Sequence, residues 1–355
     1  MTDRLDRDLL EAKMELFASS ISGMMNAAMM HVGRRLGLFD AMRGRGHITA
    51  RMLADALDLD ERFLREWLFQ QAAASVIEHR GGDRFELSEE AAVLLGPESG
   101  LNIGPSLDHL PALFSLALGS EEAFRTGQGR SFEQSGEGCA RLLDAAMGIW
   151  NRQSLVADAL PLLEGIVKRL RAGGSVADIG CGAGAAAIAV GAAFPKSKVR
   201  GYDTSDTALR IAAENLAEAG LPNVTFHNPL RDPLPDEPTF DLVMTIDCLH
   251  DMPDPEAVTA SVRGAIKPTG VWLIADVEAA TPPEANISRA GADMLFALSV
   301  SMCLQSGMSE PGGRGLGAVG LPEPAMEQLV RAAGFARFRR LSISHPSNAF
   351  YEVRP

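Results

Sequence analysis

The stretch Val176-Ala-Asp178-Ile-Gly180-Cys181-Gly182-Ala-Gly184 decides the fold of this chain. An apolar run ends in a carboxylate, passes through three glycines and enters the alanine-rich segment 185–193, which predicts a strand, a tight turn and a helix. Glycine is favoured where the backbone takes left-handed angles or where a ligand must approach the main chain closely. Asp203 ends the next strand-like run, where a carboxylate can bind both hydroxyls of a ribose. The pattern predicts a site for a cofactor that carries a nucleoside.

The spacing of these residues fits two classes of cofactor. Gly180, Gly182 and Ala185 also satisfy the dinucleotide pattern G-x-G-x-x-G/A, so a nicotinamide or flavin dehydrogenase is one interpretation. Asp178 would repel a pyrophosphate at the first turn but suits an ammonium group. S-adenosyl-L-methionine has an ammonium group, a ribose diol and no phosphate. The residues therefore favour S-adenosylmethionine, and a glycine-rich loop without any ligand is the third interpretation.

Composition and charge narrow the class of protein. The 355 residues have room for two domains, and a formal net charge of −13 opposes binding to nucleic acid or anionic lipid. The N-terminus is unlike a signal peptide, and the longest apolar run, 185–194, is too short to cross a membrane. We expect a cytoplasmic enzyme with reduced thiols and no metal, because no zinc-type spacing joins its four cysteines. These are Cys139, Cys181, Cys248 and Cys303.

Residues 1–95 predict a mainly helical domain that ends in a short hairpin. Helical periodicity covers 9–30, 50–57 and 61–76, and two short strands flank the tip at Gly81-Gly82-Asp83, which together predict a winged helix. A winged helix suggests binding to DNA, which requires a basic face. Between positions 40 and 90, however, seven arginines and no lysine stand against eleven acidic residues. The charge therefore opposes a nucleic-acid partner.

The remainder of the chain predicts a helical connector, 96–170, and an α/β domain, 171–355. Strands are expected at 175–179, 198–203, 223–227, 240–247 and 270–276, with helices between most of them, as in a parallel sheet with right-handed crossovers. The last two strands, 335–344 and 348–353, are too close for a crossover helix and should pair antiparallel.

An acidic residue before x-G-x-G-x-G and a parallel sheet closed by an antiparallel hairpin make the chain resemble the class I S-adenosylmethionine-dependent methyltransferases. The stretches 36–42 (LGLFDAM) and 63–68 (FLREWL), followed by the wing, resemble the caffeic-acid-type small-molecule O-methyltransferases and bacterial two-domain relatives. The resemblance implies a Rossmann-like α/β fold, a homodimer and a small-molecule acceptor. It implies that the cofactor contacts Asp178, Gly180, Cys181, Gly182, Gly184, Asp203 and Thr204.

A histidine follows the fourth expected strand on the edge where such sheets carry their sites. The segment 249–254 (LHDMPD) looks like the family's H-D-W-x-D segment, so the resemblance implies that His250 is the general base and Asp276 orients it. A structural histidine is the alternative. Asp247 should line the cofactor pocket, and Asp232 is the nearest acid to the adenine position, although displaced by two residues. Residues 285–317 should cap the acceptor.

These inferences predict O-methylation of a small apolar or aromatic metabolite. The alternative is a ligand-sensing transcriptional regulator that keeps a methyltransferase-like domain and uses its winged helix on DNA. A methyltransferase-like fold with other chemistry is a further interpretation. The sequence does not name the acceptor.

Overall fold

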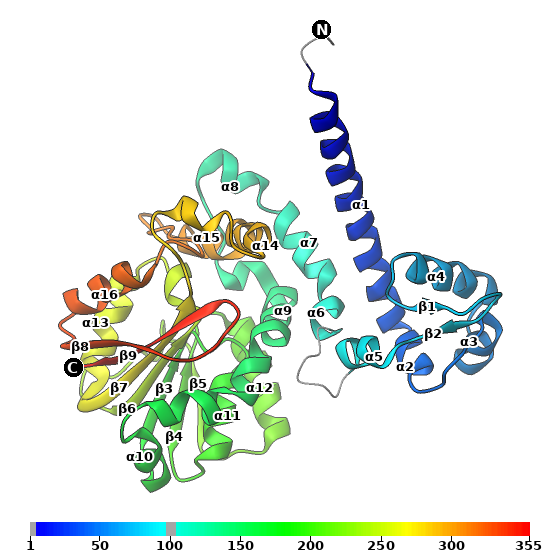
Figure 1. Cartoon of the computed structure of the whole chain (residues 1–355). Coiled ribbons are helices and arrows are strands. Elements are labelled where there is room, and N and C mark those ends of the chain that lie inside the picture. Colours follow the sequence, from blue (N-terminus) through cyan, green and yellow to red (C-terminus); the bar gives the residue numbers. More distant parts are fainter. Residues whose placement is uncertain (1–4, 97–103) are drawn as a thin grey trace. The chain divides into compact units, whose positions relative to one another are not determined.

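The structure is a computed structural model that describes residues 5–96 and 104–355 (Figure 1). The chain forms two compact units, Met1–Pro111 and Ala112–Pro355. The segment 96–170, expected as a connector, is divided between these units, and its residues 97–103 lie outside the described residues. Within the described part, no helix combines the length and apolar character needed to span a membrane.

The N-terminal unit is a winged helix, as the sequence predicts. Thr49 and Asp60 each begin a helix, because their side chains accept hydrogen bonds from backbone N–H groups of the first turn. The two wing strands pair antiparallel, and a bridge between Ile48 and Phe85 extends this pairing. The elements are α1 (Arg7–Arg35), α2 (Leu38–Met42), α3 (Ala50–Leu57), α4 (Glu61–Ala73), β1 (Glu78–His79), β2 (Phe85–Glu86), α5 (Glu89–Leu95) and α6 (Gly104–Asp108).

A seven-stranded sheet in the order β5-β4-β3-β6-β7-β9-β8 forms the centre of the C-terminal unit. The five strands β3, β4, β5, β6 and β7 are parallel to one another, whereas β9 runs antiparallel to both β7 and β8. The predicted parallel sheet with an antiparallel hairpin is therefore confirmed. The strands are β3 (Ser175–Ile179), β4 (Lys198–Tyr202), β5 (Val224–His227), β6 (Phe240–Ile246), β7 (Ile266–Val277), β8 (Arg337–Leu341) and β9 (Asn348–Arg354).

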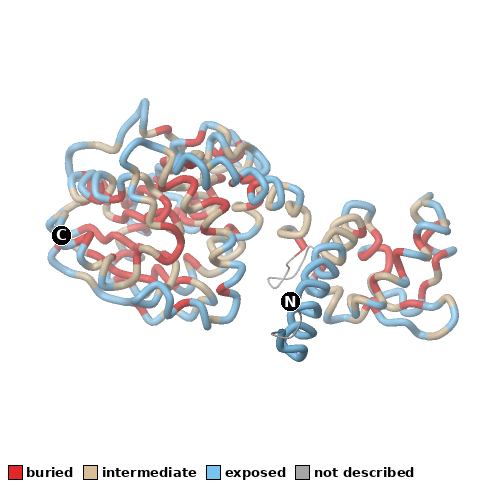
Figure 2. The backbone as a smooth tube through the Cα atoms, turned by 90° about the horizontal axis from the view of Figure 1, so that it is seen from above, coloured by how far each residue is buried: buried red, intermediate tan, exposed pale blue. Residues whose placement is uncertain are grey.

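Helices cover both faces of the sheet, and the buried residues gather between the layers (Figure 2). Successive side chains of a strand point to opposite faces, so Leu242 and Met244 belong to one core and Val243 to the other. The carboxyl ends of the parallel strands stay available for loops that carry polar residues. The first face carries α10 (Ile166–Ala172), α11 (Ala185–Ala193) and α12 (Asp206–Ala219), and the second carries α13 (Pro255–Ala265) and α16 (Glu323–Ala332).

Helix α9 (Phe132–Gln153) lies in the segment expected as a connector and belongs to the unit that contains the sheet. It begins at a capping box formed by Ser131 and Gln134, bends at Gly136, and packs against α11 and α12. The neighbouring elements are α7 (Leu110–Leu118), α8 (Glu121–Thr126), the π-helical turn η1 (Leu155–Ala159) and the 3-10 turn η2 (Leu160–Leu162).

The segment between β7 and α16 lies against the loop that follows β6. Its turns η5 and α15 contact the short 3-10 turn η3 (Leu249–Asp251), so this segment covers the end of β6. The backbone of Met308 accepts a hydrogen bond of 2.9 Å from Gly129, which ties the segment to the loop before α9. The segment contains η4 (Pro283–Asn286), α14 (Ala292–Leu298), the π-helical turn η5 (Ser299–Cys303) and α15 (Leu304–Gly307).

Candidate active site

The turn after β3 has the left-handed backbone for which its glycines were expected. Gly180, Gly182 and Gly184 have φ angles of 70°, 53° and 83°. The N–H groups of Gly180 and Cys181 donate to the carbonyl of Tyr202 at 2.8 and 3.0 Å. The turn is therefore fixed to the end of β4, and a side chain at any of the three glycines would strain the backbone.

The three glycines differ in the space around them. A Cβ at Gly184 would lie 2.4 Å from the Phe226 ring, and one at Gly180 would lie 2.7 Å from the Cβ of Cys248. At Gly182, apart from the glycine and its two neighbours in the chain, no atom of the described residues lies within 4 Å of the position that a Cβ would take. Protein packing thus requires two of the glycines, whereas the third leaves room for a ligand beside the main chain.

Asp178 lies at the end of β3 with 2% of its surface exposed. One of its carboxylate oxygens accepts a 3.1 Å hydrogen bond from the N–H of Ala187, in the first turn of α11. Burial raises the pKa of Asp178 to about 7, the bond from Ala187 opposes this change, and the charge of Asp203 adds to it. A cation beside this carboxyl group would favour its ionised form.

Asp203 follows β4 and braces the glycine turn with both carboxylate oxygens. One oxygen accepts from the N–H of Gly182 at 2.9 Å, and the other accepts from the N–H of Ser205 at 2.8 Å. Burial raises the pKa of Asp203, while these two hydrogen bonds lower it. Glu133 of α9 accepts from the Ser205 hydroxyl at 2.7 Å and so holds this loop from outside.

A buried His–Asp pair lies at the carboxyl ends of β6 and β7. His250 Nδ1 and Asp276 Oδ1 are 2.5 Å apart, and the two side chains are 4% and 2% exposed. Because an ionised carboxylate only accepts hydrogen bonds, the ring N–H at Nδ1 must donate. The other oxygen of Asp276, Oδ2, is buried without a hydrogen-bond partner in the described part of the chain. The pair therefore fixes the ring and leaves Nε2 as the acceptor of the neutral imidazole.

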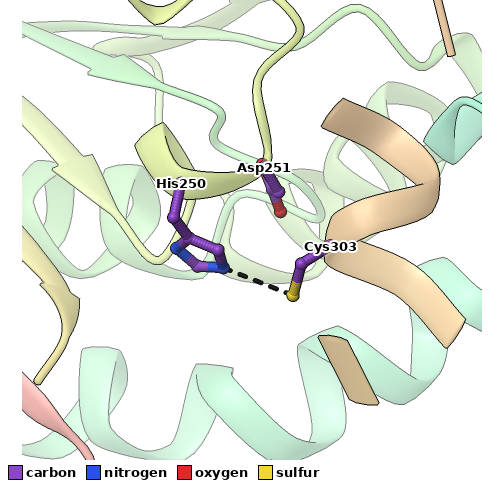
Figure 3. Close-up of side chains that lie close together, drawn as sticks. All are labelled: His250, Asp251 and Cys303. Carbon is purple, nitrogen blue, oxygen red and sulfur yellow. Dashed lines mark hydrogen bonds between the residues drawn. The ribbon is translucent and has the colours of Figure 1, made fainter. Parts of the chain in front are cut away.

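Cys303 lies next to this second ring nitrogen. Its Sγ is 3.3 Å from His250 Nε2, and the thiol comes from the π-helical turn η5, far from His250 in the sequence. Figure 3 shows that Asp251 points into the same space from η3. The side chain of Asp251 is buried. A nitrogen, a sulfur and a carboxylate thus converge at the end of β6.

The ionisable groups around His250 shift one another's pKa values. Burial would lower the pKa of His250, but the charge and hydrogen bond of Asp276, with Cys303, raise it above its ordinary value. Burial, with repulsion from Asp276, raises the pKa of Asp247 to about 7, and burial raises that of Asp251 to about 8, while His250 opposes both shifts. The sheet edge therefore carries several buried acids and favours a positively charged ligand.

Asp247 occupies a strained position at the end of β6. Its φ is 52°, which a non-glycine residue rarely adopts. Its backbone N–H donates to the carbonyl of Ala275 at 2.9 Å, and its carboxylate accepts from the buried amide of Asn348 at 2.6 Å. These two bonds hold the residue against the adjacent strands β7 and β9, so its side chain has a fixed place at the sheet edge.

Two family models match this chain. A model described as a methyltransferase domain matches residues 177–272, and one described as an Rv2258c-like winged HTH domain matches residues 24–96. The ubiquinone biosynthesis O-methyltransferase of Paracidovorax citrulli is 32% identical over 103 residues, which are 28% of this chain and 42% of that protein. The one of Albidiferax ferrireducens is 30% identical over 129 residues, 36% of this chain and 50% of that protein. The chain thus spans half or less of these relatives' length.

Solved structures show the same two-domain fold over nearly the whole chain. Mitomycin 7-O-methyltransferase has a TM-score of 0.69 at 21% identity, covering 98% of this chain and 99% of that one. Human N-acetylserotonin methyltransferase, solved with S-adenosylmethionine, has a TM-score of 0.68 at 18% identity, covering 100% and 99%. The chain is a class I methyltransferase fold with an N-terminal winged helix. Its methyltransferase domain implies S-adenosylmethionine as cofactor or cosubstrate.

The remaining predicted residues, Cys181, Thr204 and Asp232, lie in different environments after β3, β4 and β5. Cys181 packs against Gly201, and burial, with the charges of Asp203 and Asp178, raises the pKa of its thiol well above the ordinary value, so it stays neutral. Thr204 is exposed directly after Asp203. Asp232 is also exposed, at 65% of its side chain, and pairs with His227 at 2.6 Å.

Sequence reasoning missed Cys303 and Asn348 and gave Asp251 only a structural role. In the sequence, Cys303 is one of four scattered cysteines, and no motif spacing connects it with His250. Asn348 begins β9, and its amide reaches Asp247 only because the antiparallel hairpin places the two strand ends together. The sequence offered one signal for the contact between Asn348 and Asp247. The expected antiparallel pairing of the last strands places the start of β9 near the carboxyl ends of β6 and β7.

Proposed function

We propose that this protein is an S-adenosylmethionine-dependent methyltransferase that methylates a hydroxyl group of a small apolar or aromatic metabolite. The observation that carries the proposal is the buried His250–Asp276 pair, which lies at the same edge of the sheet as the glycine turn. The O-methyltransferase names of the curated relatives agree with it. The acceptor and the full activity are part of the proposal.

The residues around the glycine turn fit the cofactor. The open space at Gly182 can take a ligand close to the main chain, and the excess of buried carboxyl groups suits a cationic molecule. We assign the ammonium group to Asp178, the ribose diol to Asp203 with Thr204 beside it, and the methionine end to Asp247. Asp232 is assigned the outer edge of the adenine site, with the smallest share of binding because it is exposed.

The bound cofactor supplies an electrophilic methyl group, so the protein has to position the acceptor and take its proton. His250 Nε2 accepts the proton of the acceptor hydroxyl, and Asp276 stabilises the imidazolium that forms. Cys303 occupies the place beside Nε2 and has to yield it to the acceptor. The raised pKa of His250 makes the ring a stronger base, but it also requires a pH at which the ring is neutral.

The segment that covers the end of β6 favours an apolar acceptor. Met302 belongs to a small core with Leu142, and Leu298 packs against it. Methionine and leucine side chains form adaptable apolar walls, which suit a hydrophobic or aromatic ring. The carboxyl groups beside His250 disfavour an anionic acceptor at this position.

The winged helix supports a role in assembly rather than in binding DNA. Arg51, Arg62 and Arg65 on α3 and α4 pair with carboxylates of the same helices, which leaves no excess of positive charge for phosphate. Helix α1 instead exposes apolar side chains, which supports a homodimer. These include Leu9, Leu10, Met14, Leu16, Phe17, Ile21, Met24 and Met25. The four free cysteines support a cytoplasmic location.

Binding of S-adenosylhomocysteine to the full chain, measured by calorimetry, is the first test. We expect micromolar affinity that Asp203→Ala abolishes, because this carboxylate both braces the turn and faces the ribose. A screen of phenols, carboxylates and amines with labelled S-adenosylmethionine then finds the acceptor. No detectable cofactor binding to the folded protein contradicts the proposal, as does binding of NAD in its place.

A further inference from the structure

We propose that His250, Asp251 and Cys303 form a binding site for a thiophilic divalent cation of the Zn²⁺ type on the acceptor side of the sheet edge. The three residues offer one imidazole nitrogen, one carboxylate oxygen and one thiol sulfur (Figure 3). Zinc in proteins prefers this set of donors. The site contains none of the residues assigned to the cofactor. Two of its side chains, Asp251 and Cys303, take no chemical step in the proposed methyl transfer.

The distances permit coordination with small side-chain movements. The three donor atoms all lie within 4.8 Å of one another, and His250 Nε2 and Cys303 Sγ are 3.3 Å apart. One point can therefore lie within about 2.8 Å of all three atoms, compared with bond lengths of about 2.0–2.3 Å in zinc sites. The chain segments that carry the donors are held together, because η5 and α15 pack against η3.

The surroundings of His250 match those of a metal-binding histidine. Metal-bound imidazoles commonly donate their other ring N–H to a carboxylate, which fixes the ring and raises its basicity. Asp276 makes this contact with Nδ1 at 2.5 Å, and the second oxygen of Asp276 has no hydrogen-bond partner among the described residues. Nε2 is thus directed at the proposed ion, with the orienting partner already in place.

Charge and burial also favour a cation. The side chains of Asp251 and Asp276 are buried, with 7% and 2% of their surfaces exposed. The Asp251 carboxylate and the Cys303 thiolate together would balance the charge of a divalent ion, whereas in the ion's absence two such negative charges repel. Three protein ligands leave a fourth position for water or an acceptor oxygen, the arrangement of zinc sites that bind exchangeable ligands.

The ion would compete with catalysis. This consequence rests on the proposed function, in which the lone pair of Nε2 accepts the acceptor proton. A bound cation occupies that lone pair, so methyl transfer should fall as the site fills with zinc and recover when a chelator removes the ion. Binding of the ion itself does not depend on the identity of the acceptor.

Cobalt(II) titration of the metal-free full-length protein tests the site. Co²⁺ replaces Zn²⁺ in tetrahedral sites and gives visible d–d bands and a near-ultraviolet thiolate band. We expect one equivalent to bind with the thiolate band, and Zn²⁺ to displace it. Cys303→Ser should remove the thiolate band, and Asp251→Asn should weaken binding by at least about tenfold. Asp276→Asn should weaken it by about 10–100-fold through loss of the orienting contact.

Cys139→Ala is the matched control, because it removes a buried thiol of the same unit that is neither a proposed metal ligand nor a residue assigned to the cofactor. It should keep the band and bind Co²⁺ within about twofold of the unmodified protein. Circular dichroism checks that each variant is folded, and Asp251→Asn replaces Cys303→Ser as the decisive variant where the serine chain unfolds. Absence of the thiolate band in the unmodified protein overturns the proposal, as does a band that survives Cys303→Ser.

Two further outcomes separate this proposal from the proposed function. Normal binding of S-adenosylhomocysteine without any cobalt band rejects the metal site and leaves the methyltransferase intact. A cobalt band that depends on Cys303, in a protein that does not bind S-adenosylhomocysteine, supports the metal site and rejects the cofactor assignment.

Discussion

The turn after β3 and the loop after β6 lie at the same edge of one sheet, but they are built differently. The turn takes its residues from one short stretch plus Asp203, and its hydrogen bonds run to backbone N–H groups. The loop after β6 takes its side-chain partners from three other segments, β7, η5 and β9, as His250 does with Asp276 and Cys303 and Asp247 does with Asn348.

This difference indicates which substitutions should affect cofactor binding and which should affect the reaction with the acceptor. A site made from backbone geometry has a fixed shape, which suits a cofactor that lies close to the main chain. A site made from distant side chains can exchange one group without altering the turn, which suits acceptors that differ between proteins. Variants at the two places should therefore affect different measurements.

The largest expected effect is on the side-chain site. His250→Asn should lower kcat for the acceptor found in the screen by about 10²–10⁴-fold, because the base is lost while the amide keeps a polar group in the pocket. Affinity for S-adenosylhomocysteine, measured by calorimetry, should stay within about twofold, because no residue of the turn changes. A rate near that of the unmodified protein between pH 6 and pH 9 would make His250 structural.

A pair of glycine variants tests the backbone site. Gly184→Ala places a Cβ 2.4 Å from the Phe226 ring at a positive φ, so we expect about 2–4 kcal/mol of destabilisation in urea unfolding. Gly182→Ala has a positive φ but an open surrounding, so it should cost only about 1–2 kcal/mol. The second variant should still lose cofactor affinity. Full affinity in Gly182→Ala would place the cofactor elsewhere.

Cofactor affinity should depend on pH near neutrality. Asp178 and Asp247 each have a pKa of about 7, chiefly because they are buried, and a cation favours their ionised forms. Affinity for S-adenosylmethionine should thus fall below pH 7 by up to about tenfold per pH unit for each carboxyl group that binds a proton. Calorimetry between pH 5.5 and pH 8.5 measures this change. A flat profile would remove both carboxylates from the cofactor contacts.

Stability of the cofactor-free protein should change with pH in the opposite sense. A carboxyl group whose folded-state pKa is raised above the unfolded value of about 3.9 stabilises the fold at low pH and loses that contribution as the pH rises toward 7. Asp178, Asp247 and Asp251 all belong to this class. Thermal unfolding should therefore show that S-adenosylhomocysteine raises Tm more at pH 8 than at pH 6. An equal rise at both values contradicts the charge argument.

The smallest effect is expected at the exposed end of the cofactor site. Asp232→Asn replaces the carboxylate that contacts His227 on a side chain that is 65% exposed, so stability should change by less than about 1 kcal/mol. Cofactor affinity should fall by no more than about threefold. A loss of tenfold or more in calorimetry would make Asp232 a main contact for the adenine.

Much of the fold could be predicted because its signals are local. The strand expected at 175–179 has the same bounds in the structure, and Thr49 and Asp60 cap the helices expected to begin at 50 and 61. Each of these features depends on residues a few positions apart. The packing of helix α9 was less accessible. Helix α9 packs on α11 and α12, and a contact with distant helices leaves no mark in its own periodicity.

The sequence by itself determined the glycine turn, the order of strands and helices, and a histidine at the end of the fourth strand of the sheet. Local backbone angles and apolar periodicity encode these features within a few residues of each one. Only the tertiary structure decided that Cys303 and Asp251 meet at His250 and that Asn348 binds Asp247. Cys303 and Asn348 lie far along the chain from His250 and Asp247. The packing of η5 and α15 against η3 brings Cys303 to His250, and the order of β6, β7 and β9 in the folded sheet brings Asn348 to Asp247.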